Sequence, residues 1–145
     1  KLEEGKADAM VLAAAGLKRL GIENKISRYF TLDEMIPSAG QGILAVQGRQ
    51  GEDYSYLRCI DDEESRTAAL AERSFVKTLD GTCASPIAAH AELYGDSVRL
   101  AGMYYSEEKE RRIFGEISGK CMEAEELGRH LALKLKRNDG VWHDI

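Results

Sequence analysis

The sequence has 145 residues, of which 43% are hydrophobic and 31% charged, and its formal net charge is −5. This composition is typical of a globular protein, and the mixed charge provides no basic surface for nucleic acid. No apolar run approaches the roughly 20 residues that cross a bilayer, and the first residues do not resemble a secretory signal. Three cysteines without a zinc spacing indicate reduced thiols, so we expect a cytoplasmic protein without a metal site.

The first 60 residues predict pieces of a sheet. A near-continuous apolar run favours a strand buried on both faces, and alternation of apolar with polar residues favours a half-buried strand. The predicted elements, in order, are a buried strand (7–15), a short helical turn (17–21), a strand (26–32), a loop (33–42), a short buried strand (43–46) and a weak helix (54–60).

The remaining residues predict a compact α+β unit. Acidic residues at 61–64 precede an apolar stripe with helical spacing, which ends at Gly81. Three strands then follow (86–93, 98–105 and 111–118), the first two joined by a hairpin turn at 94–97, and a second helix (122–135) closes the unit. The fold class is therefore α/β and α+β, with a division near residue 60. The first part looks like a sheet whose partner strands are absent, so we expect the chain to be part of something longer.

Cys83 is the residue that we expect to carry chemistry. It lies in a predicted loop between the first helix and the first strand, where a ligand can reach a thiol. A small buried side chain is the commoner fate of a free cysteine, and from the residues alone this alternative stays open. Cys59 lies in the predicted weak helix and Cys121 stands at the start of the last predicted helix, and for both we favour the structural role.

Two further segments could bind a ligand. Gln41 and Gly42 end a loop rich in glycine, whose backbone N–H groups suit an anionic ligand, although a plain hinge is the alternative. Arg19 follows the predicted buried strand, at the sheet end where α/β folds bind ligands, and an arginine there can hold a carboxylate with two hydrogen bonds. An ordinary surface arginine is the alternative.

Taken together in order, these segments resemble the porphobilinogen deaminase family, also called hydroxymethylbilane synthase. The segments that carry the resemblance are 7–21, 36–42, 71–73 and 81–87, the last containing Gly81-Thr82-Cys83 where many family members have Gly-Gly-Cys. The resemblance implies an enzyme about twice this length, with two periplasmic-binding-protein-like lobes and a small third domain. Residues 1–60 would then be the end of domain two, a hinge and a returning segment of domain one, and residues 61–145 the C-terminal domain.

The resemblance also implies a chemistry. The family joins four porphobilinogen units with loss of ammonia, for porphyrin and heme biosynthesis, on a dipyrromethane cofactor bound through a thioether. Carried over, the cofactor cysteine is Cys83, the loop lining the cofactor cleft contains Gln41 and Gly42, and Arg19 binds the substrate's carboxylates. Arg73 matches a position that we assign to an interdomain ion pair.

The resemblance also implies what this chain lacks. The catalytic aspartate and most substrate arginines would lie in a missing N-terminal half, so we predict no synthase activity for this chain alone. The full-length enzyme would be a monomer. A non-enzymatic ligand-binding or interaction module, completed by a partner chain or by dimerisation, remains the alternative from the residues, as does an independent cysteine-nucleophile enzyme.

Overall fold

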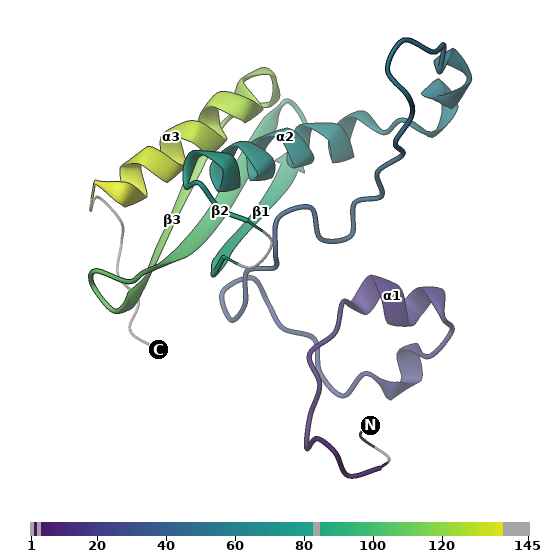
Figure 1. Cartoon of the computed structure of the whole chain (residues 1–145), viewed down its shortest axis with the longest axis vertical. Coiled ribbons are helices and arrows are strands. Elements are labelled where there is room, and N and C mark those ends of the chain that lie inside the picture. The colour runs from purple at the N-terminus through teal and green to yellow at the C-terminus, as the bar shows by residue number, and fades with distance from the viewer. Residues whose placement is uncertain (1, 3, 83–84, 138–145) are drawn as a thin grey trace. The chain divides into compact units, whose positions relative to one another are not determined.

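The computed structural model describes residues 2, 4–82 and 85–137, and these form two compact units, Lys1–Thr31 and Leu32–Ile145. The first unit contains a short helix, α1 (Ala14–Arg19), and a 3₁₀ turn, η1 (Glu23–Lys25). The second contains the 3₁₀ helix η2 (Ser55–Ile60), two long helices and a three-stranded sheet (Figure 1). The predicted division near residue 60 concerns the domains of a longer protein and stays a prediction.

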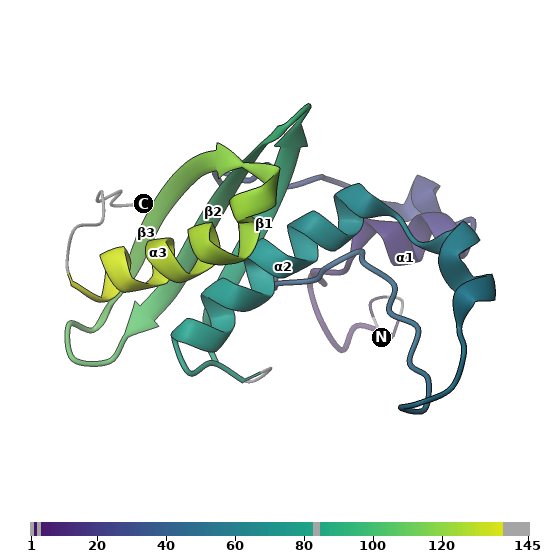
Figure 2. The same ribbon diagram turned by 90° about the horizontal axis from the view of Figure 1, so that it is seen from above.

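The sheet and its two helices form a two-layer body. The helices are α2 (Glu63–Thr78) and α3 (Ala124–Lys136), the latter preceded by the turn η3 (Cys121–Glu123). The strands are β1 (Ile87–Tyr94), β2 (Ser97–Ser106) and β3 (Arg111–Lys120), antiparallel in the order β1-β2-β3. Both helices lie on the same face of this sheet, with α2 over β1 and α3 over β3 (Figure 2). The predicted helices, strands and hairpin of this part are confirmed.

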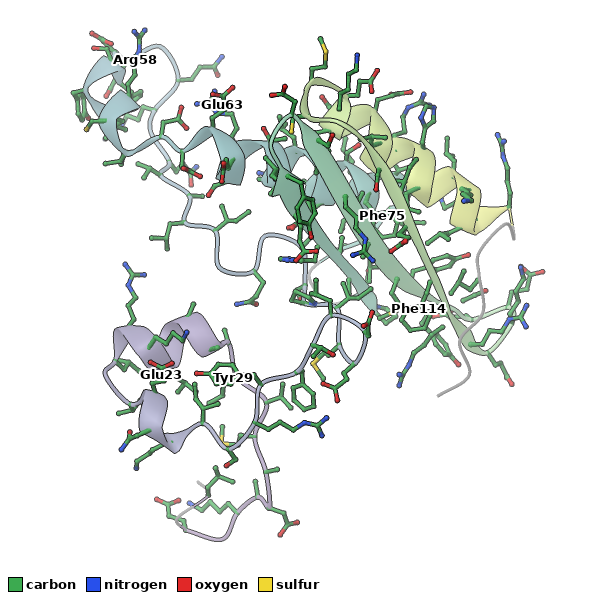
Figure 3. The ribbon with its side chains drawn as sticks, turned by 180° about the vertical axis from the view of Figure 1, so that it is seen from behind. Glu23, Tyr29, Arg58, Glu63, Phe75 and Phe114 are labelled. Carbon is green, nitrogen blue, oxygen red and sulfur yellow. The ribbon has the colours of Figure 1, made fainter. Side chains whose placement is uncertain are left out.

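The core of the body lies between the helices and the sheet. Its largest fully buried side chains are Phe75, Val98, Leu100, Leu131 and Leu135. Phe75 extends from α2 toward the sheet (Figure 3), where a β-carbon on Gly102 would come within 2.6 Å of its ring. Gly115, directly opposite Gly102 on β3, makes room for Leu135 in the same way. The paired glycines thus let both helices approach the sheet closely.

The strands predicted in residues 1–60 are wrong for this chain. Residues 7–13, 26–32 and 43–46 form no strand, and apolar side chains that should be buried are exposed. Val11 is 64% exposed and Leu44 74%. A β-strand needs backbone hydrogen bonds to a neighbouring strand. Without such a neighbour, a segment with a strand-like apolar pattern stays irregular. The predicted loop at 33–42 is confirmed, the weak helix at 54–60 is a 3₁₀ helix, and the turn at 17–21 is the end of α1.

Candidate functional site

The segment that leads to Cys83 is fixed by the C-terminal end of α2. The Asp80 N–H donates to Lys77 O and the Gly81 N–H to Val76 O, the two bonds of a Schellman motif. Asp80 takes the left-handed conformation that this motif requires, with φ of 56°. Next to it, Gly81 packs so closely that a β-carbon would lie 2.5 Å from the Ile87 side chain. The direction in which the chain leaves α2 is therefore well specified.

Lys136, at the end of α3, also holds this segment. Its Nζ donates to Thr78 O at 3.1 Å and lies 3.4 Å from an Asp80 carboxylate oxygen. A cation at the C-terminus of a helix satisfies free carbonyls and complements the helix dipole. Lys136 thus joins α3 to the end of α2, just before the segment that contains Cys83.

Cys83 itself lies outside the described residues, but its neighbours on both sides are described. The Ser85 N–H donates to Thr82 O at 3.0 Å, and the Thr82 N–H donates to the Ser85 hydroxyl at 2.9 Å. The Ile87 N–H then donates to Ser85 O, where β1 begins. The position of Cys83 in the sequence is therefore between a capped helix and the first strand of the sheet, as predicted, and its role stays a prediction.

Residues 37–43, here called the glycine loop, consist of two successive tight turns. The Gln41 N–H donates to Ser38 O and the Ile43 N–H to Gly40 O, both at 3.0 Å. The third residue of each turn is a glycine with positive φ, Gly40 at 77° and Gly42 at 88°, as a type II turn requires. Gln41 and Gly42 are exposed, and within the described residues the Gly42 N–H has no acceptor. The loop thus presents an exposed backbone donor of the kind predicted to meet carboxylates, and the Gln41 side-chain amide is a second donor that was not predicted.

The glycine loop lies along the outer edge of β1. The Ala89 N–H donates to Pro37 O at 3.1 Å, and the Gly40 N–H donates to the carboxylate of Glu72 on α2 at 2.6 Å. Ala89 and Ser85 are four residues apart, about 13 Å along an extended chain. The strand thereby brings the glycine loop and the flanks of Cys83 to the same part of the body. Neither Glu72 nor Lys136 was predicted, although a glutamate within the apolar stripe of α2 is a signal of a buried polar contact.

Arg19 lies in the first unit, whereas Gln41 and Gly42 lie in the second, and the structure defines each unit by itself. Arg19 is the exposed last residue of α1, whose end is fixed by the bonds Gly21 N–H to Lys18 O and Ile22 N–H to Leu17 O.

A small polar cluster supports the end of α1. The Tyr29 hydroxyl donates to the neighbouring Glu23 carboxylate at 2.8 Å (both are labelled in Figure 3). This hydrogen bond, followed by the charge of Lys18, lowers the pKa of Glu23. The same hydrogen bond raises the pKa of Tyr29. The cluster joins α1 to the turn that follows it, and Arg19, the next residue after Lys18, is exposed to solvent.

The other singled-out residues behave as surface or structural groups. Cys59 is exposed and its thiol donates to Tyr56 O at 3.3 Å, and Cys121 is half-buried against Gly95. Arg73 is exposed, and in the described part of the chain it has no acidic partner, so its interdomain ion pair stays a prediction. Over residues 2, 4–82 and 85–137, no group of three or more histidine, cysteine or acidic side chains is arranged to hold a metal ion. No helix in that part is long and apolar enough to span a membrane.

Two family models match the chain in succession. Residues 1–56 match the dipyromethane cofactor binding domain of porphobilinogen deaminase, and residues 66–137 match the C-terminal domain of porphobilinogen deaminase. The chain belongs to the porphobilinogen deaminase family. The second model covers the helix–sheet body, and the first covers residues 37–43, the glycine loop that packs on this body.

Similar proteins agree with this membership. Over 97% of its length the chain is 44% identical to a porphobilinogen deaminase of Ruminiclostridium josui, of which it covers 48%. It is 43% identical to that of Alkaliphilus oremlandii and 36% identical to that of Nitrobacter hamburgensis, in each case over 97% of the chain and 47% and 45% of the relative. The chain thus spans about half the length of the curated porphobilinogen deaminases it matches.

Proposed function

We propose that this chain is the C-terminal part of a hydroxymethylbilane synthase, which joins four porphobilinogen units with loss of ammonia. The observation that carries the proposal is the match of two successive segments to two domains of one enzyme family. The matched segments meet where the glycine loop bonds to β1, the strand that follows the Cys83 segment.

Cys83 is the proposed attachment residue of the dipyrromethane cofactor. A thiolate is a strong nucleophile, and the thioether that it forms is stable enough to hold an anchor through repeated additions. The cofactor, when bound, supplies the pyrrole carbon from which the product grows. The chain's own contribution is to hold that anchor at the junction of α2 and β1, where the Schellman end of α2 and the Thr82–Ser85 bonds fix both flanks.

The described residues fit a group that carries carboxylates. Gln41 presents an exposed side-chain amide, and Gly42 presents an N–H with no acceptor in the described part of the chain, so both can donate to a carboxylate oxygen. Arg19 adds a guanidinium, which binds carboxylates through two parallel bonds. In the proposed enzyme Gln41 and Gly42 bind acidic side groups of the cofactor, and Arg19 binds those of the substrate.

Residues 1–60 are proposed to complete two periplasmic-binding-protein-like lobes with an N-terminal half. The support is the row of exposed apolar side chains in this region, since such side chains are normally buried against neighbouring strands and helices. The exposed large apolar residues of this region are Leu2, Met10, Val11, Leu12, Leu20, Tyr29, Phe30, Met35, Leu44, Val46, Tyr56 and Ile60. We therefore expect the chain alone to show no synthase turnover.

The test is to co-express the chain with the N-terminal half of the Ruminiclostridium josui enzyme and to measure intact mass and peptide masses. We expect a mass raised by one dipyrromethane, located on the peptide that contains Cys83. Cys83→Ala should abolish the addition, whereas Cys59→Ala and Cys121→Ala should retain it. The two halves of the Ruminiclostridium josui enzyme, expressed in the same way, are the positive control.

Consumption of porphobilinogen with release of ammonia is the second measurement. The complemented pair should turn over and the isolated chain should not. If the two halves co-elute and the control pair carries cofactor, an unmodified Cys83 would contradict the assignment. Turnover by the isolated chain would contradict the need for a second half.

A further inference from the structure

Glu72 is a charged side chain inside an otherwise apolar core. Only 3% of its surface is exposed, and its helical neighbours Ala68, Ala71 and Phe75 are buried core residues. A carboxylate in such a place is costly unless hydrogen bonds compensate for the lost water. The hydrogen-bond donors to Glu72 therefore indicate its structural role.

Both oxygens of Glu72 accept a backbone N–H, and the two donors come from different segments. Oε1 accepts from the Ala91 N–H of β1 at 2.8 Å, and Oε2 accepts from the Gly40 N–H of the glycine loop at 2.6 Å. The nearest basic group is the half-buried His90, whose Nδ1 lies 3.7 Å from Oε1, beyond hydrogen-bond distance. Glu72 is thus a bridge between a strand edge and a loop.

The Glu72 carboxylate takes the place of one hydrogen-bond acceptor that a neighbouring strand would provide at the edge of β1. Along the outer edge of β1, the Ala89 N–H is met by the Pro37 carbonyl, as it would be by a neighbouring strand. At the next outward N–H, that of Ala91, the chain after Pro37 has already turned away into the glycine loop. The Glu72 carboxylate occupies the place of the missing carbonyl and at the same time binds the loop that left it.

We propose that Glu72 is a positioning residue that fixes the glycine loop on β1 and thereby sets where Gln41 and Gly42 present their donors. This inference rests on the proposed function only in that the loop then contacts cofactor or substrate carboxylates. Gly40 is bound by Glu72 and is followed directly by Gln41, so a shift of the Gly40 amide displaces both donors. Ser85, the flank that follows Cys83, leads into the same strand through its bond with the Ile87 N–H, so the bridge fixes the loop relative to that flank.

The chemistry of the bridge requires a carboxylate of this length. A glutamine keeps one accepting oxygen, but its NH₂ group would face the second N–H, so one of the two backbone donors loses its acceptor. An aspartate keeps both oxygens but is shorter by one methylene. Glu72→Gln should therefore release one end of the bridge with almost no change in side-chain volume.

The first test uses the unaltered chain and nuclear magnetic resonance. Scalar couplings across hydrogen bonds should connect the Gly40 and Ala91 amide nitrogens to the Glu72 side-chain carboxyl carbon. Hydrogen exchange at Gly40 should accelerate about tenfold to a hundredfold in Glu72→Gln. Glu64→Gln, an exposed change two turns earlier on α2, should leave both amides unchanged. Absence of the couplings, or unchanged exchange of both amides in Glu72→Gln, would overturn the proposed bridge.

The second test uses the complemented enzyme and separates positioning from plain stabilisation. Glu72→Gln should raise KM for porphobilinogen about tenfold with kcat changed less than threefold, because the loop binds side groups that stay the same through the reaction. Ile113→Val, a core change on β3 away from the loop, serves as the control that lowers stability without moving KM. Equal KM values for Glu72→Gln and the unaltered pair would show that the bridge only supports the fold.

The two proposals fail in different ways. If the unaltered complemented pair takes up no cofactor while the Glu72 couplings are present, the proposed function is wrong and the bridge stands. If the pair is loaded and active but the couplings are absent, the bridge is wrong and the function stands.

Discussion

The helix–sheet body and the first 60 residues have similarly apolar sequences, but every fully buried apolar side chain among the described residues belongs to the body. In the body, Phe75, Leu100 and Leu131 are fully buried, whereas Leu12, Leu44 and Ile60 are more than half exposed. In the body, the two helices cover the apolar face of the three-stranded sheet, so both layers bury their apolar side chains against each other. The difference shows that an apolar pattern specifies a buried strand only when the strands that complete it are present.

The largest expected effect is on the hydrogen exchange of residues 9–13, 26–32 and 43–46. If these segments lack only their neighbours, adding the N-terminal half of the Ruminiclostridium josui enzyme should slow their amide exchange about a thousandfold, since they become hydrogen-bonded strands. Amides of β2, already paired on both sides, should change little. Fast exchange in a co-eluting pair would show that these segments do not form strands even with the N-terminal half present. Absent neighbouring strands would then not explain their exposed apolar side chains.

The same substitution in the two regions should have very different costs. Leu131→Ala removes a fully buried side chain and should lower the free energy of unfolding by about 3 kcal/mol, because it leaves a cavity. Leu44→Ala, at a position 74% exposed, should change it by less than about 0.5 kcal/mol. Urea unfolding followed by circular dichroism measures both. Similar costs would mean that Leu44 is packed in solution and that the first 60 residues bury apolar side chains as the body does.

A smaller effect is expected at the link between α2 and α3. Lys136→Met removes the cation bound to Thr78 O and Asp80 but keeps most of the aliphatic stem, and should cost about 0.5 to 1 kcal/mol. Lys134→Met, two residues earlier and exposed, is the matched control and should be near neutral. Equal thermal midpoints for the two variants would show that the link adds nothing to the body's stability.

The smallest effect is expected at the N-terminus of α2 and depends on pH. The Ser65 hydroxyl and then the Ser65 backbone N–H bond to the Asp62 carboxylate and hold its pKa below the usual 3.8. A carboxyl whose folded pKa is lowered stabilises the fold above its unfolded pKa, and this contribution disappears as the pH falls through the folded pKa. Asp62→Ala should therefore lower the urea midpoint slightly at pH 7, and the difference should shrink as the pH falls below 3.8.

Glu64→Gln, in the first turn of α2 but not its cap, is the control for this pH dependence and separates the hydrogen bond from the helix dipole. A carbon-13 titration that places the pKa of Asp62 at or above 3.8 would contradict the capping interaction.

The body was predictable because its signals are local. The acidic start and apolar stripe of α2, the Tyr94–Ser97 turn and the stripe of α3 each depend on neighbours a few residues away. Glu72 and Lys136 were missed because their partners lie far along the sequence, 32 residues from Glu72 to Gly40 and 58 from Lys136 to Thr78. The strands of residues 1–60 were predicted wrongly because periodicity reports which side chains should be buried but not whether a neighbouring strand exists.

The order of the strands predicts which contacts form first during folding, those within the sheet or those of the glycine loop. Each neighbour in the β1-β2-β3 sheet is also the next strand in the sequence, and the connecting turns at 95–96 and 107–110 are only two and four residues long. Short loop closures favour rapid folding, whereas contacts between distant residues form more slowly. The contact of Pro37 with Ala89 closes a segment of about fifty residues. In refolding experiments, β1, β2 and β3 should thus be protected early, and the Gly40 amide only in a later phase.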